Sequence, residues 1–162
     1  MSAPTDAARV LLRHSVATVA YRAAKAVRGA PDDFATFRAW DGTRTPIAIL
    51  AHLGDLFDWA LTTARGDERW HEATPQSWPE EVERFFTSLE RFDAHLASEQ
   101  PLASPPERLF QGPIADALTH IGQLTMLRRA AGRPVRGENY HRADIVGGRV
   151  GPEQTAPRRE FD

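Results

Sequence analysis

An aspartate and a histidine, Asp116 and His120, stand four residues apart in the stretch GPIADALTHIGQLTMLRRAAG. Residues at this spacing lie on the same side of an α-helix. The apolar residues of the stretch recur every three or four positions, and Pro113 and Gly132 suit its first turn and its left-handed end. Asp116 and His120 therefore border a buried helix face, where a carboxylate and an imidazole either bond each other or bind a ligand together.

A second histidine, His52, lies in the apolar run ILAHLGDLFDWA and also borders an apolar helix face. Two histidines and one aspartate suit Zn²⁺, with Ni²⁺ or Fe²⁺ as alternatives, and leave coordination positions open for water or substrate. A simpler interpretation makes Asp116 the hydrogen-bond acceptor of His120 on an exposed flank, and His52 a core histidine. The spacing alone leaves both interpretations open.

Other polar side chains could act beside such a site. His14, Asp55 and His141 are the candidates for a general base. His14 is alternatively a fourth ligand or a histidine at the edge of the core. Asp55 stands three residues after His52 and either orients that imidazole or is solvated. The segment GENYHRAD is a lid, a dimer contact or an inert part of the tail.

Aromatic residues are the candidates for the walls of a binding pocket. Trp59 and Tyr140 are the two expected near the open side of the metal, where they would contact a cofactor or substrate. His71 and His95 are expected to be solvated. The tryptophans are otherwise predicted to be packing residues: Trp40, Trp59, Trp70 and Trp78.

Four helices must position these side chains. Thr45 followed by Pro46 suits a helix start, and Ser77 with Glu80 has the spacing of a capping box. No strand pattern of useful length occurs, so the sequence predicts an all-α, up-down four-helix bundle with long loops and an irregular C-terminal tail. The expected helices run from about Asp6 to Arg28, Thr45 to Gly66, Ser77 to Ser98 and Gly112 to Gly132.

Length and composition limit the possible classes of protein. The 162 residues suit one domain, with the bundle over 1–134 and a tail over 135–162 that packs partly on it. The end of the tail, from about Thr155, is expected to be disordered. A net charge of −2 without a basic stripe argues against nucleic-acid binding. We find no membrane-spanning run and no export signal, so the expected location is the cytoplasm.

The helix motifs resemble those of the DinB-like (DinB/YfiT) superfamily of metal-binding four-helix bundles. The resemblance covers about Thr5 to Pro134 and rests on ILAHLGDLFDWA, on ALTHIGQLTMLRRAAGRPV and on the helix order. It implies that His52 is the first metal ligand and His120 the last. Asp116 stands where many members have His and a thiol-dependent transferase branch has Glu. The usual Arg after the last His is replaced by Ile121 here.

The resemblance also implies a function. It suggests a metal-dependent enzyme that acts on small molecules, either a thiol-dependent S-transferase or a hydrolase. The chain contains no cysteine, so a reacting thiol would come from a low-molecular-weight thiol cofactor. The alternative is a non-enzymatic bundle with a structural or vestigial metal site. In both cases we expect a homodimer that contacts neither nucleic acid nor membrane.

Overall fold

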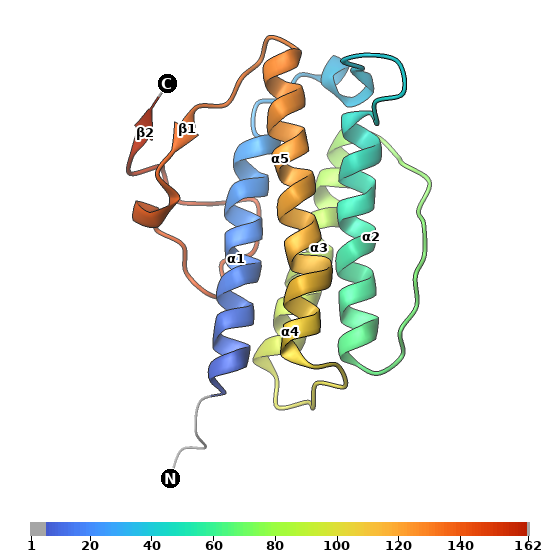
Figure 1. The fold of residues 1–162 in the computed structure, drawn as a ribbon, viewed down its shortest axis with the longest axis vertical. Helices are drawn as coiled ribbons and strands as arrows, with labels where there is room; N and C mark the ends of the chain where they lie inside the picture. The colour runs from blue at the N-terminus through green and yellow to red at the C-terminus, as the bar shows by residue number, and fades with distance from the viewer. Residues whose placement is uncertain (1–5, 162) are drawn as a thin grey trace.

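Four long helices make up about half of residues 6–161, the part of the chain that this computed structural model describes (Figure 1). The expected domain limits at residues 1 and 162, and Thr5 as the start of the resemblance, lie outside the described residues. The predicted all-α bundle with long loops is confirmed. The long helices are α1 (Ala7–Val27), α2 (Pro46–Ala64), α3 (Trp78–Ala97) and α5 (Ala115–Ala130).

The starts of α2 and α3 follow the predicted caps. The Thr45 side chain accepts a hydrogen bond from the backbone N–H of Ala48. Ser77 and Glu80 form a capping box, in which the Ser77 backbone N–H donates to the Glu80 carboxylate at 3.0 Å. These bonds satisfy N–H groups that a helix start leaves without partners. After the C-terminal end of the fourth long helix, Gly132 has the expected left-handed backbone, with φ at 73°.

The fourth helix starts earlier than the sequence indicates. Helical backbone begins with the short α4 (Pro106–Leu109) and passes through a π-helical turn (Phe110–Ile114) into α5. Pro113 therefore lies inside this helical path, and its expected place in a first turn is wrong. A π turn leaves room for a residue that has no backbone N–H to donate, so the proline does not end the helix.

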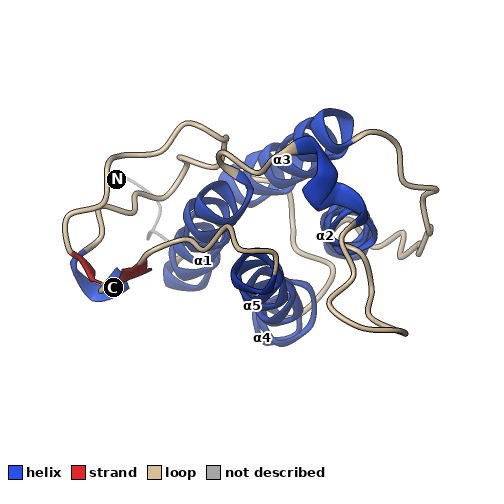
Figure 2. Ribbon diagram, turned by 90° about the horizontal axis from the view of Figure 1, so that it is seen from above, coloured by secondary structure: helices blue, strands red, loops and turns tan. Residues whose placement is uncertain are grey.

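The helices are ordered so that each contacts two others. Seen from above, α1 and α2 lie diagonally opposite, and α3 and α5 fill the other two corners (Figure 2). Arg84 bonds to Ala51 and Ser88 bonds to Asp58, so α2 and α3 run in the same direction. Because α2 and α3 are parallel, the linker of residues 65–77 must return along the length of the bundle from the end of α2 to the start of α3 (Figure 1). The long linkers of the sequence thus include one full crossover.

Apolar side chains from all four long helices fill the centre of the bundle. Phe57, Phe85 and Phe92 are fully buried there, and the ring of Phe57 packs against those of the other two. His95 is also buried, with 6% of its surface exposed, so the expectation that it is solvated is wrong. Burial, followed by the nearby charge of Arg65, lowers the pKa of His95. In the described part of the chain, no helix combines the length and the apolar character needed to cross a membrane.

Arg84 on α3 pairs with two buried carboxylates, that of Asp55 on α2 and that of Glu81 on its own helix. The Arg84 guanidinium donates to Asp55 Oδ1 at 3.0 Å and to Glu81 Oε2 at 2.9 Å. It also donates to the backbone carbonyl of Ala51. Gly54 permits this approach, because a Cβ atom at that position would lie 2.8 Å from the guanidinium carbon. Asp55 and Glu81 are 3% and 1% exposed, so they depend on Arg84 for their charge partner.

The tail packs on α1 and contains two short strands and a 3₁₀ turn. Strand β1 (Gly137–Glu138) pairs antiparallel with β2 (Glu160–Phe161), and a 3₁₀ turn (Tyr140–Arg142) follows β1. A second 3₁₀ turn (Asp32–Thr36) follows α1. Figure 1 shows the tail on the side of α1 that faces away from α2.

Ion pairs with α1 hold the tail in place. The Lys25 ammonium donates to Glu138 at 2.8 Å and to Glu160 at 3.0 Å, and the Tyr21 hydroxyl donates to Glu138 at 2.5 Å. The predicted disorder from Thr155 is therefore wrong for residues 155–161, because the attraction of Glu160 to Lys25 offsets the low apolar content of this segment.

Candidate metal centre

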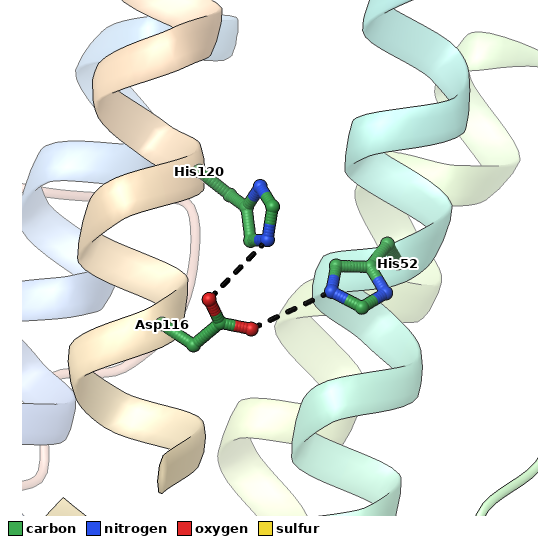
Figure 3. Close-up of side chains that lie close together, drawn as sticks. All are labelled: His52, Asp116 and His120. Carbon is green, nitrogen blue, oxygen red and sulfur yellow. Dashed lines mark ion pairs between the residues drawn. The ribbon is translucent and has the colours of Figure 1, made fainter. Parts of the chain in front are cut away.

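His52, Asp116 and His120 lie together at the seam between α2 and α5 (Figure 3). His52 comes from the second turn of α2, and the other two come from consecutive turns of α5. Both helices continue above and below the three side chains (Figure 3). We call these residues the His–Asp–His trio. Their meeting depends on the antiparallel packing of α2 against α5, which brings residues far apart in the sequence side by side.

The spacing of the trio fits ligands that share one ion. His120 Nε2 lies 3.4 Å from Asp116 Oδ1, and His52 Nε2 lies 3.6 Å from Asp116 Oδ2. Hydrogen bonds between such groups are about 2.7–3.2 Å long. Two ligand atoms about 2.0–2.2 Å from a tetrahedral zinc ion are about 3.3–3.6 Å apart. The simpler interpretation, in which Asp116 accepts a hydrogen bond from His120, fits the 3.4 Å distance less well.

Gln123 fixes the orientation of His120. The Gln123 side-chain oxygen lies 3.0 Å from His120 Nδ1. With this amide oxygen as the acceptor, the proton of a neutral His120 sits on Nδ1, and the lone pair of Nε2 faces Asp116. This is how a second residue commonly orients a metal-binding imidazole. The sequence shows Gln123 one turn after His120, but only the structure reveals its role.

The environment of His52 favours its neutral form. Burial lowers the pKa of His52, the charges of His120 and Arg44 lower it further, and the Asp116 carboxylate opposes them. The imidazole is therefore neutral near pH 7, as a metal ligand must be. The Asp116 side chain is 45% exposed, against 19% and 13% for the two imidazoles. The trio is consequently open to solvent on the aspartate side.

Trp70 lies beside the trio, a position that the sequence does not indicate. Its ring centroid is 5.6 Å from that of His52 and 6.1 Å from that of Trp59. Trp59 therefore lies behind Trp70, where its Nε1 donates to Glu68 at 3.1 Å. Trp70 is 48% exposed, and Trp40 is 65% exposed, so neither is the packing residue that was expected. Trp70 belongs to the 65–77 crossover, whose path over the bundle has no signal in the sequence.

The structure brings none of the other predicted polar candidates into the trio. Asp55 is buried, but it is bonded to Arg84 and to the backbone N–H of Ala73 rather than to His52. His14 and His141 are exposed, on α1 and in the tail, and lie outside the group of ligand atoms. His71 is exposed, as predicted.

Tyr140 also lies away from the trio. Its ring packs edge-on against Tyr21 at 6.3 Å between centroids, and the Arg22 guanidinium lies 3.9 Å above it. Both partners belong to α1. Tyr140 therefore anchors the tail on the bundle, on the side of α1 away from α2.

Changing Gln123 tests its role as the orienting residue. We expect Gln123→Ala to lower the zinc affinity of the protein by about 10- to 100-fold, because His120 would no longer be held in one tautomer. Competition with a chromophoric chelator measures this. Thr125→Ala, two residues further along α5 and therefore on another flank, is the matched control. Equal affinity of the Gln123 variant and wild type would show that Gln123 does not orient His120.

Fold and site together define a four-helix bundle with a candidate divalent-metal centre on the seam between its second and fourth long helices. No family model, curated protein or solved structure matches the chain.

Proposed function

We propose that this protein is a DinB-like, divalent-metal-dependent enzyme that acts on small molecules. The single observation that carries the proposal is the convergence of two imidazoles and a carboxylate, with ligand atoms within 4.8 Å of one another, on a partly exposed seam. Similar donor sets hold catalytic zinc in proteins and leave a position free for a reactant. The resemblance of the two helix motifs to the superfamily supports the same conclusion.

Each residue of the trio has a defined part in this proposal. His52 and His120 would hold the ion through Nε2, and Asp116 would hold it through its carboxylate. A divalent ion bound here would supply Lewis acidity, which lowers the pKa of a water or thiol at the site. Gln123 keeps the His120 lone pair available, and Trp70 shields His52 from solvent on one side.

A thiol-dependent transferase is the first activity to test, and hydrolysis is the second. Because the chain has no cysteine, a thiol must come from a separate molecule such as bacillithiol, mycothiol or glutathione. The exposed side of Asp116 leaves room for it to approach. Zinc is the first metal to test, since two nitrogen ligands and one carboxylate suit it, with nickel and iron next.

Calorimetry on zinc-loaded protein tests the transferase activity. We expect each zinc-loaded chain to bind one thiol molecule, and His52→Ala to abolish this binding because it removes a ligand of the ion. His141→Ala, at an exposed histidine of the tail, should behave as wild type. Equal thiol binding by metal-free protein would contradict a role for the metal. If loaded wild type binds no thiol, the transferase proposal fails and the loaded protein is assayed for ester and amide hydrolysis.

A further inference from the structure

A cavity of about 340 Å³ lies along the same seam, next to the trio. The loop of residues 39–44 forms one wall, and side chains of α2 and α5 form the others. Gln123, which bonds to His120, lines the cavity, and so does Ile49, one turn before His52 on α2. A molecule bound in this space would therefore lie within one helical turn of the two imidazoles.

The cavity is mostly apolar and is bordered by two large exposed side chains. Trp40 is 65% exposed and Met126 is 67% exposed, and both line the cavity. Exposing the apolar surface of an indole ring and a thioether to water is unfavourable. Both groups are therefore well suited to contact an apolar molecule. The volume lies within the range of small-molecule sites, about 300–1,000 Å³.

Among the residues that the structure describes, Arg44 is the only charged one that lines the cavity. Across residues 6–161, no hydrogen bond or ion pair engages its guanidinium. Arg44 is exposed to solvent, so a molecule that enters the cavity can reach its guanidinium. A guanidinium beside an apolar space is suited to bind a carboxylate.

We propose that this cavity binds a small organic acid, with an apolar, aromatic body between Trp40 and Met126 and a carboxylate on Arg44. The inference rests on the proposed function in one respect: the acid is the substrate on which the metal centre acts. Binding itself requires only the cavity and Arg44. Arg44 would then be a specificity-determining residue, since it selects anionic over neutral molecules of the same shape.

Binding of two matched probes tests the proposal on the full-length, metal-free protein. The probes are 2-naphthoate and its neutral isostere 2-naphthamide, with affinities measured by calorimetry. We expect wild type to prefer the carboxylate by about tenfold, as a hydrogen-bonded ion pair can provide. Arg44→Gln should abolish this preference and leave amide binding unchanged. Arg91→Gln, at an exposed arginine of α3, should bind both probes as wild type does.

A second variant tests the apolar wall. Trp40→Ala should weaken the binding of both probes by about fivefold, because it removes the aromatic surface and not the charge. If neither probe binds wild type, or if Arg44→Gln keeps the preference for naphthoate, the proposal is overturned. Zinc binding, measured separately by loading the same variants with zinc, reports on the metal centre, so failure of the cavity and failure of the metal site give different results.

Discussion

Replacing His120 with alanine is expected to lower the zinc affinity of the protein by more than about 100-fold, because the loss of a ligand costs more than the loss of the residue that orients it. The helical fold should remain, since His120 lies on the flank of α5 and the packing is provided by apolar residues such as Leu124 and Ile121. Elemental analysis of protein purified without a nickel column measures the bound metal. Far-ultraviolet circular dichroism measures the helix content.

His141→Ala is the matched control for this experiment, because it removes an exposed histidine that lies outside the trio. If His120→Ala retains as much zinc as the control, the trio is not the metal site. If His120→Ala unfolds, the histidine is needed for packing or the metal is structural. A chelator added to wild type separates these two cases, because removal of a structural metal lowers the melting temperature far more than removal of a catalytic one.

The second large predicted effect is a loss of stability when the ion pairs between α2 and α3 are broken. Arg84→Met should lower the free energy of unfolding by about 3 kcal/mol, because two buried carboxylates lose their charge partner while most of the side-chain volume remains. Asp55 and Glu81 are both almost fully buried, so water cannot readily replace the guanidinium. Equilibrium unfolding in urea, followed by circular dichroism, measures the loss.

Arg91→Met is the control for the change from arginine to methionine, because Arg91 is exposed on the same helix. We expect it to change the free energy of unfolding by less than about 0.5 kcal/mol. A loss of similar size in both variants would mean that the buried pairs contribute little. In that case Asp55 would be held by the backbone N–H of Ala73 and would not depend on Arg84.

Periodicity and capping residues were enough to predict the helices. Thr45 and Ser77 mark the starts of α2 and α3 within one residue, because capping chemistry is local. The predicted start of the fourth helix is wrong, because a proline suits the first turn of a helix and is also accommodated in a π turn. Local preferences cannot distinguish these two places; the packing of Pro106–Leu109 against α1 decides between them.

The candidate site was only partly predictable from the sequence. Helical phase places Asp116 beside His120 and His52 at the border of an apolar face of another helix, and the family resemblance joins the three in one site. The approach of Trp70 to His52 depends on the path of a crossover loop, which has no periodic pattern. Arg84 and Asp55 are 29 residues apart, so their pairing depends on the parallel packing of α2 and α3. Glu138 resembles a solvated loop residue in sequence and is buried only because Lys25 and Tyr21 face it.

The anchoring of the tail gives the protein a built-in chemical reporter. Lys25 is the only lysine in the 162 residues. Its side chain is 10% exposed, and although burial alone would lower its pKa, the bonds to Glu138 and Glu160 raise it. An acylating reagent reacts with a neutral, accessible amine, so Lys25 is modified only while the tail has left α1. The acylation rate of one side chain, followed by mass spectrometry, therefore measures how often the tail opens.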